Sequence, residues 1–311
     1  MRRIYGIGET VLDIIFKDNE PRAAKPGGSS LNTCVTLGRL GLDVEFISEY
    51  GNDPVGDIVD SFLKNNNVKT NFITRFSDGK SALALAFLDE HNNASYTFYK
   101  DFPAERLKNI PEKTCENDIV SFCSIYAITK AVRPNLLKFV KTAKENGSII
   151  LYDPNFRAAH LHELEDLRPY IIENLKIADL VRASDEDLQN IFKVSDPVSA
   201  YDCIKDFCNV LVYTANKKGV TVLAPSGTFS FPVKKIKPVS TIGAGDNFNS
   251  GIIYGMVRDN IRKQILKNLS GEEWGRITET AVDFATEVCL TWDNYISLNF
   301  AQNYMKSKFR D

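Results

Sequence analysis

The stretch Ser240-Thr241-Ile242-Gly243-Ala244-Gly245-Asp246 has two glycines on either side of an alanine and leads directly into a helical pattern. The apolar residues Phe248, Ile252 and Met256 follow at the spacing of one helix face. Glycines at this place leave the backbone N–H groups of the first helical turn uncovered, and such groups bind anions. The stretch therefore predicts an anion-binding site at a helix N-terminus.

Asp246 is unexpected beside an anion site, because its carboxylate repels a phosphate. The position makes sense if Asp246 accepts the proton of a hydroxyl group that attacks the phosphate. The amides of Gly243, Ala244 and Gly245 would then stabilise the charge on the transferring phosphoryl group. A plainer interpretation is a glycine-rich turn in which Asp246 only caps the helix.

A second glycine-rich stretch, residues 27–32 (Gly-Gly-Ser-Ser-Leu-Asn), also opens a helix. Asn32 lies one turn inside that helix, where its amide can bond a ligand hydroxyl. Asp13 comes soon after the first apolar strand, and carboxylate and amide groups together suit the hydroxyls of a sugar. The two glycine-rich stretches and Asp13 thus favour a polyol site.

Gly6 and Gly8 resemble the start of a dinucleotide-binding fingerprint. Val11 stands where the third glycine belongs, however, and no strand–helix–strand unit surrounds the pattern. A nicotinamide-dependent oxidoreductase would rest on these two glycines and the expected parallel sheet alone.

Short apolar runs alternate with helical patterns along most of the chain. Asp53 and Pro54 begin one such helix as its cap and first residue. Strands that alternate with helices imply parallel pairing through right-handed crossovers. The sequence predicts a single domain over residues 1–311, a three-layer α/β/α sandwich with a mainly parallel central sheet. The predicted strands of this sheet are residues 4–7, 44–48, 119–123, 149–152, 179–181 and 210–213.

Three consecutive strand-like runs, residues 72–76, 81–88 and 94–99, have no helices between them to cover their faces. Together with an N-terminal run they predict a small β-sheet lid beside a cleft, formed roughly by residues 11–26 and 72–100. A plain extension of the main sheet is the alternative. The uncovered apolar face of such a lid predicts a homodimer in which two lids pack together.

The chain has 311 residues, and 38 basic against 40 acidic side chains give a formal net charge of −2. This balance offers no basic surface for nucleic acid. No apolar run approaches the length of a membrane span, and Glu9 interrupts the N-terminus too early for a signal peptide. The six cysteines include no CxxC pair, which favours reduced thiols and a cytoplasmic location. We expect no nucleic-acid or membrane partner.

These motifs together resemble the ribokinase-like PfkB family of carbohydrate kinases, and most of all its fructokinase branch. The matching motifs span nearly the whole chain: Gly6-x-Gly8-Glu9-x-x-x-Asp13, Gly27-Gly28-x-x-x-Asn32, Gly51-Asn52-Asp53, Asp153-Pro154-Asn155-Phe156-Arg157 and the signature from Gly243 to Gly251. The resemblance implies an α/β sandwich with a β-sheet lid, in which ATP and Mg²⁺ phosphorylate a sugar or nucleoside hydroxyl. Some members require a monovalent cation, a point that no residue here decides.

Carried over by motif position, the resemblance implies a catalytic base at Asp246 and an anion hole at Gly243, Ala244 and Gly245. The residues that it assigns to the sugar are Asp13, Gly28, Asn32, Arg157 and, in the lid, Phe98 and Lys100. A surface ion pair is the plainer interpretation of Arg157, and core packing that of Phe98. The residues that it assigns to the nucleotide are Ser184, Asp187, Thr214, Asn216 and Gly219, with Asp187 holding Mg²⁺ through water.

Three places depart from the family pattern. Ser240 stands where the family has an acidic residue. Ser184 and Asp187 stand at the Asn and Glu of the family's NxxE motif. Asn216 replaces the first glycine of a TxGxxG turn, where asparagine tolerates the left-handed backbone. These departures weaken the expectation for ATP handling more than the expectation for the fold.

The sequence thus predicts a fructokinase-like, ATP-dependent sugar kinase. The alternatives are a 2-keto-3-deoxygluconate or nucleoside kinase of the same family, and a non-catalytic regulator on the same fold that binds a sugar or nucleotide. An acid substrate would need a cationic clamp, for which Lys100 and Arg157 are the candidates. A nucleoside would need aromatic stacking in the lid.

Overall fold

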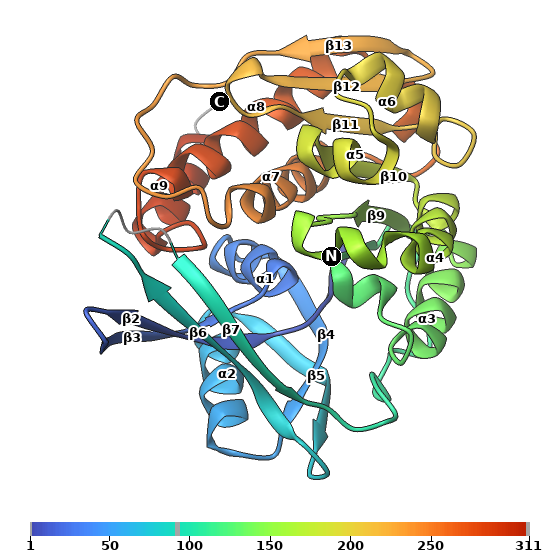
Figure 1. Ribbon diagram of the computed structural model, residues 1–311. Coiled ribbons are helices and arrows are strands. Elements are labelled where there is room, and N and C mark those ends of the chain that lie inside the picture. Colours follow the sequence, from blue (N-terminus) through green and yellow to red (C-terminus); the bar gives the residue numbers. More distant parts are fainter. Residues whose placement is uncertain (1, 91–93, 309–311) are drawn as a thin grey trace.

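The computed structural model describes residues 2–90 and 94–308, whose strands form two sheets (Figure 1). The larger sheet has nine strands in the order β13-β12-β11-β10-β9-β8-β1-β4-β5. In chain order these are β1 (Arg3–Ile7), β4 (Asp43–Gly51), β5 (Val68–Phe76), β8 (Ile119–Cys123), β9 (Ile149–Asp153), β10 (Leu180–Ser184), β11 (Leu211–Thr214), β12 (Val220–Ala224) and β13 (Gly227–Phe231). All neighbours from β5 to β11 pair in parallel, and β12 pairs antiparallel with both of its neighbours. The predicted, mainly parallel sheet is confirmed.

Helices cover both faces of this sheet because successive strand residues point to opposite sides. Ile4 and Ile149 belong to one buried core cluster, whereas their neighbours Tyr5 and Ile150 belong to the other. The first cluster packs under α1 (Ser29–Arg39), α2 (Pro54–Asn65), α7 (Ala244–Arg258), α8 (Gly271–Cys289) and α9 (Leu298–Lys308). The second packs under α3 (Arg133–Glu145), α4 (Leu164–Ile177), α5 (Asp185–Phe192) and α6 (Pro197–Ile204). Short 3₁₀ turns are η1 (Ile125–Ile128), η2 (Ala158–Glu163), η3 (Asn216–Lys218) and η4 (Leu266–Asn268).

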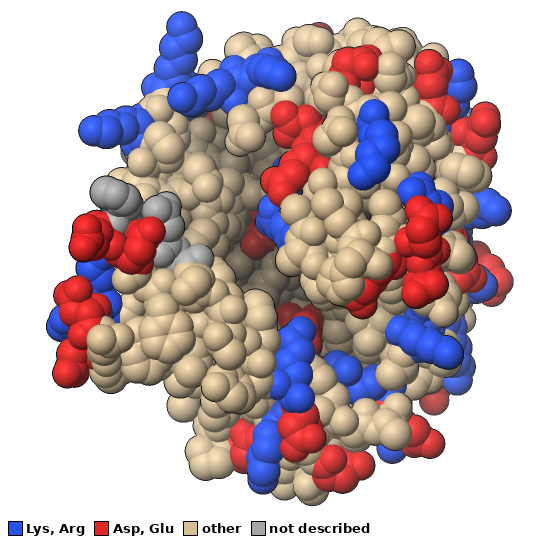
Figure 2. Space-filling model, viewed as in Figure 1, with Lys and Arg blue, Asp and Glu red and all other residues tan. Residues whose placement is uncertain are grey.

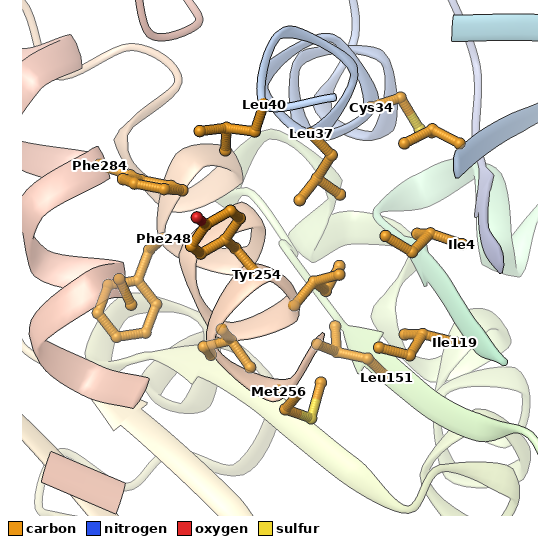
Figure 3. Packing of buried hydrophobic residues seen from close by; sticks show 14 of the residues in the cluster. Ile4, Cys34, Leu37, Leu40, Ile119, Leu151, Phe248, Tyr254, Met256 and Phe284 are labelled. Atoms are coloured by element: carbon orange, nitrogen blue, oxygen red, sulfur yellow. The ribbon is translucent and has the colours of Figure 1, made fainter. Parts of the chain in front are cut away.

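Helices α1 and α7 pack against each other within the first core cluster. Figure 3 shows Leu37 of α1 and Leu40, the residue after α1, on the side that faces Tyr254 of α7 and Phe284 of α8. Gly251 of α7 lies so close to the α8 backbone that an added Cβ would clash with Ala281. This packing fixes where α1 and α7 begin. No helix in the described ranges is both long and apolar enough to cross a membrane.

The smaller sheet is the lid, with strands β2 (Val11–Lys17), β3 (Glu20–Gly27), β6 (Lys80–Leu88) and β7 (Ala94–Asp101) in the order β3-β2-β6-β7. It consists of two antiparallel hairpins, β2–β3 and β6–β7, joined by the parallel pair β2–β6. The expected assignment of residues 72–76 to this lid is wrong. They lie in β5, which pairs in parallel with β4 after the α2 crossover, because the strand pattern alone does not reveal its pairing partner.

Asp53 connects the root of the lid to the main body. Its carboxylate caps α2 by accepting a hydrogen bond from the Gly56 amide at 2.8 Å, as the sequence predicts. The same carboxylate accepts the backbone N–H of Ser81 at 2.9 Å and the Ser81 hydroxyl at 2.7 Å. Ser81 lies at the start of β6, so a single partly buried capping group also fixes this strand where it leads into the lid.

Candidate active site

Helices α1 and α7 both begin at the carboxyl edge of the parallel strands, and their first turns meet at Asp246. The Ser29 hydroxyl donates to Oδ1 of Asp246, and the Asn32 side-chain amide donates to Oδ2 at 2.8 Å. Thr33 of α1 donates its hydroxyl to the Asp246 carbonyl oxygen at 3.0 Å. The two glycine-rich stretches of the sequence are therefore brought together around one carboxylate.

The surroundings of Asp246 adjust its affinity for a proton. Burial raises the pKa of Asp246 above its ordinary value, while the hydrogen bonds from Asn32 and Ser29 lower it. Oδ1 of Asn32 is buried and has no hydrogen-bond partner among the described residues. Asn32 thus holds Asp246 with its donor and leaves an acceptor that a ligand hydroxyl can fill.

The loop before α7 presents backbone amides as the sequence predicts, with one difference. Gly243 precedes α7 in the left-handed conformation, with φ of 78°, and an added Cβ would lie 2.7 Å from the carbonyl oxygen of Asn294. Within the described chain, the amides of Gly243 and Gly245 donate to no acceptor. The amide of Ala244 instead closes a turn onto the Thr241 carbonyl at 3.3 Å, so it is less available to an anion than we expected.

Asn247 anchors this loop, a role that the sequence patterns do not reveal. Its side-chain amide donates to the carbonyl oxygens of Gly243 and Asn294, both at 2.8 Å. Its Oδ1 accepts the Thr36 hydroxyl at 2.5 Å. Asn155 belongs to the motif from Asp153 to Arg157, and its side-chain amide donates to the Ser29 hydroxyl at 3.0 Å. The only signal that a single sequence offers is position: Asn247 follows Asp246 directly, and Asn155 lies in the loop after β9.

On the lid side, Asp13 is a partly buried carboxylate that accepts no hydrogen bond from the described residues. Burial raises its pKa to about 6. The strand register places Asp13, Ala84 and Phe98 in one row across β2, β6 and β7, and so on one face of the lid. Tyr96 lies on the same face and stacks on Phe98 with ring centroids 5.9 Å apart.

Gly28, the residue before α1, has φ of 128° and passes so close to the Glu9 carbonyl that an added Cβ would clash.

The two cations considered for a substrate clamp already face carboxylates. Nζ of Lys100 lies 2.8 Å from Oε2 of Glu9, in the loop after β1. Arg157 is largely exposed, and its Nη1 lies 4.0 Å from Oε2 of Glu186. Lys100 therefore connects β7 to the main body, and Arg157 is placed near enough to Asp246 to lower the pKa of that carboxyl group.

The turn after β11 keeps the shape expected of a nucleotide-side turn. Asn216 has φ of 45° and Gly219 has φ of 104°, which confirms the prediction that Asn216 takes the left-handed backbone of the missing glycine. The Gly219 carbonyl accepts the Ala215 amide at 3.0 Å. Thr214, just before the turn, accepts a hydrogen bond from Arg182 at 2.7 Å.

Asp187 has a structural use that leaves little room for a metal. Its Oδ1 accepts the Phe156 amide at 2.7 Å, and its Oδ2 accepts the Ser184 amide at 2.8 Å and the Ser184 hydroxyl at 2.6 Å. With Ser184 it forms a capping box that begins α5. No three His, Cys, Asp or Glu side chains gather as a metal site in residues 2–90 and 94–308. The donor set does not fit a protein-bound Mg²⁺, and we assign Asp187 to the start of α5.

A hollow opens in the middle of the face shown in Figure 2, and acidic atoms are visible inside it. The lid contacts the carboxy-terminal part of the molecule through Lys25 of β3, whose Nζ lies 2.7 Å from Oδ1 of Asp293. Asn294, the next residue, holds the Gly243 loop through Asn247. Lid and anion site are thus linked by a short chain of contacts.

A three-layer α/β/α sandwich with a β lid, unshielded amides at a helix start and a carboxylate beside them define a kinase that acts on a small-molecule hydroxyl. The chain belongs to the pfkB family of carbohydrate kinases, whose family model matches residues 1–289. It is therefore an ATP-dependent phosphotransferase.

Relatives named for different substrates resemble the chain to a similar degree. A fructokinase of Klebsiella pneumoniae is 28% identical over 265 residues, which cover 83% of this chain and 86% of the relative. An aminoimidazole riboside kinase of Salmonella typhimurium is 24% identical over 264 residues, covering 84% and 82%. The match to the family model establishes the kinase class, and relatives at these identities leave the sugar open.

Solved structures show the same fold. Aminoimidazole riboside kinase from Salmonella enterica, complexed with aminoimidazole riboside and an ATP analog, superposes with a TM-score of 0.83 at 21% identity, covering 98% of this chain and 99% of the other. Fructokinase from Vibrio cholerae O395, with fructose, ADP and calcium ion bound, gives a TM-score of 0.83 at 24% identity, covering 96% of each chain.

The Gly243 loop allows a matched test with Gly41, which has a similar φ of 73° but open space around it. Changing either residue to alanine should lower the free energy of unfolding of the protein by about 1–2 kcal/mol, because alanine is strained in the left-handed conformation. Only Gly243→Ala also pushes against Asn294, so it should additionally lower ATP-dependent turnover. Urea unfolding and steady-state kinetics check both variants. Equal turnover in the two would contradict the placement of the anion site.

Proposed function

We propose that this kinase phosphorylates a neutral sugar of the fructose type in the cleft between the lid and the sandwich. The observation that carries the proposal is the placement of Asp246 beside the free amides of Gly243 and Gly245 and within reach of α1 polar groups. Proton acceptor and anion site are thus adjacent, as phosphoryl transfer to a hydroxyl requires.

The charge around the cleft favours an uncharged sugar over a sugar acid. A carboxylate substrate such as 2-keto-3-deoxygluconate would need a free cation, but Lys100 is paired with Glu9 and Arg157 faces Glu186. Asp13 adds a further negative charge on the lid face at neutral pH. Carboxylate oxygens accept hydrogen bonds from sugar hydroxyls, and their negative charge repels the carboxylate of a sugar acid.

In the proposed reaction, the Asp246 carboxylate accepts the proton of the attacking sugar hydroxyl. Oxygen of that hydroxyl bonds to the γ-phosphorus while the bond from phosphorus to the bridging oxygen of ADP breaks. The amides of Gly243 and Gly245 stabilise the negative charge of the transferring group. Mg²⁺, arriving with the nucleotide phosphates, would neutralise part of their charge. Asp13 and Asn32 would hold the other sugar hydroxyls, and lid closure would exclude water.

A riboside is the second candidate substrate, and one observation favours it. Tyr96 and Phe98 form a stacked pair that is 45% and 56% exposed on the lid face shared with Asp13. Such a pair offers an aromatic surface to a heterocyclic base. One relative of this chain, from Salmonella typhimurium, is named for its action on aminoimidazole riboside.

The deciding experiment measures ADP formation with ATP and Mg²⁺ over fructose, ribose, 2-keto-3-deoxygluconate, aminoimidazole riboside and other nucleosides. Fructose should give the highest kcat/KM. We include K⁺ and Na⁺ arms, because a fructokinase variant from Vibrio cholerae O395 has been solved with potassium ion bound. A riboside with higher kcat/KM would replace the sugar assignment. Binding of every ligand without turnover would instead support a non-catalytic regulator.

Asp246→Asn should remove nearly all turnover, with a loss on the order of 10² to 10⁴ for the proton transfer alone. The asparagine keeps the size of the side chain and can still bond Ser29, so sugar binding should survive. Calorimetry of the sugar and single-turnover kinetics measure the two effects. Turnover close to that of the unaltered enzyme would contradict the base assignment.

The raised pKa of Asp13 makes sugar binding depend on pH. A protonated Asp13 accepts fewer hydroxyl hydrogen bonds, so the KM for sugar should rise as the pH falls through about 6. Well below that pH the rise should approach roughly tenfold per pH unit. Asp13→Asn should have a high KM at every pH. A pH-independent KM in the unaltered enzyme would rule out this role for Asp13.

We also propose a homodimer through the lid face opposite Asp13. Phe16 and Phe87 stack on that face at 4.9 Å, and Phe87 and Tyr99 are 38% and 56% exposed. Burying such side chains against a second copy is favourable. Light scattering should give twice the chain mass, and Phe87→Glu should reduce it. A single 34.9 kDa species for the unaltered chain would contradict the dimer.

A further inference from the structure

Arg182 is a buried arginine on an interior strand of the parallel sheet. It lies near the carboxyl ends of the strands, where the candidate site is. It is the third residue of β10, between β9 and β11, and its side chain is only 10% exposed. Arginine is rarely buried without partners. Its flanking residues Val181 and Ala183 are apolar core residues, so this charge departs from the pattern of the strand.

The guanidinium group joins the ends of three neighbouring strands. Nη1 lies 3.0 Å from Oδ2 of Asp153, the last residue of β9. Nη2 donates to the Thr214 hydroxyl at 2.7 Å, and Thr214 is the last residue of β11. Arg182 therefore connects the loop that carries Asn155 with the turn that carries Asn216.

The same group supports the first turn of α7. A Cβ added to Gly245 would lie 3.0 Å from Nη1 of Arg182, and the guanidinium carbon lies 5.6 Å from the centre of the Phe248 ring. Gly245 has no positive φ, so the group that limits a side chain here is the Arg182 guanidinium, which would have to shift to admit a Cβ. The first turn of α7 therefore packs closely on this charged group.

Arg182 also offsets an acidic environment. Burial opposes its charge, but Asp153, Asp187 and Asp246 raise the pKa of Arg182 above its ordinary value. The group therefore stays protonated. Without it, these carboxylates would stand beside the anion site with no buried positive charge to balance them, and a phosphate would be repelled.

We infer that Arg182 is a positioning residue of the phosphoryl-transfer site, which holds the first turn of α7 against the nucleotide-side turn and supplies the buried positive charge that lets this acidic cluster accept a phosphate. The inference rests on the proposed function. Arg182 should therefore affect the binding of nucleotide phosphates and the turnover, and it should leave the binding of sugar under the lid unchanged.

The test compares Arg182→Gln and Arg182→Lys with Arg133→Gln, a control that removes another buried arginine. Arg133 begins α3 and is bonded to Ala127, Asn174 and Glu173, none of which belongs to the candidate site. We expect Arg182→Gln to weaken ADP binding by calorimetry at least tenfold and to lower kcat about a hundredfold, with the KM for sugar within twofold. Arg182→Lys should recover part of both losses. Equal losses in Arg133→Gln, or an equal rise in the sugar KM, would overturn the inference.

Gly245→Ala provides a second test, which leaves the buried charge of Arg182 in place and adds only a methyl group beside it. Its methyl group should displace the guanidinium, lowering kcat and ADP affinity in the unaltered background by at least threefold. In the Arg182→Lys background the same change should have a smaller effect, because the displaced Nη1 is absent. Additive effects would overturn the inference. ADP binding is measurable even if no sugar on the panel is phosphorylated, so failure of the proposed function is distinguishable from failure of this one.

Discussion

The hydrogen bonds that Ser29 and Asn32 donate to Asp246 join two helices whose contacting residues lie up to 217 positions apart in the chain. Neither helix could present this site alone. The parallel sheet brings both N-termini to one edge, and the packing of α1 against α7 keeps them at the distance where polar side chains meet. The site therefore depends on the core beneath it, where shifts of α1 relative to α7 would separate donor from acceptor.

Charge is balanced locally throughout the site. Asp153 is bonded by Arg182 and by the Asn249 amide at 2.7 Å, Asp187 by backbone and Ser184 groups, and Asp246 by neutral donors. Of the three carboxylates, only Asp246 depends on neutral side-chain donors alone. Burial raises the pKa of both Asp187 and Asp246, and no cation bonds either of them directly. Asp246 differs from Asp187 in lying in the first turn of α7 beside the amides of Gly243 and Gly245, which is why we propose it as the proton acceptor.

Local patterns in the sequence predicted the features that neighbouring residues determine. The cap at Asp53, the start of α7 at Ala244 and the left-handed backbone of Asn216 all follow from the chemistry of a few adjacent residues. Features that depend on distant partners were missed. Residues 72–76 were placed in the lid because a strand pattern does not reveal its neighbour, and β12 and β13 were not predicted. The partners of Lys100, Asp187 and Ala244 likewise come from folding, which brings Glu9, Phe156 and Thr241 to them.

The lid is assembled from two hairpins separated in the chain by α1, β4, α2 and β5. Its central pair, β2 with β6, joins segments that lie far apart in the chain, such as Leu12 and Leu83. Pairings between distant segments are slow to form because loop closure costs entropy before any contact is made. The local β2–β3 hairpin can therefore form before β6 pairs with it, which leaves one edge of β2 unpaired in the meantime.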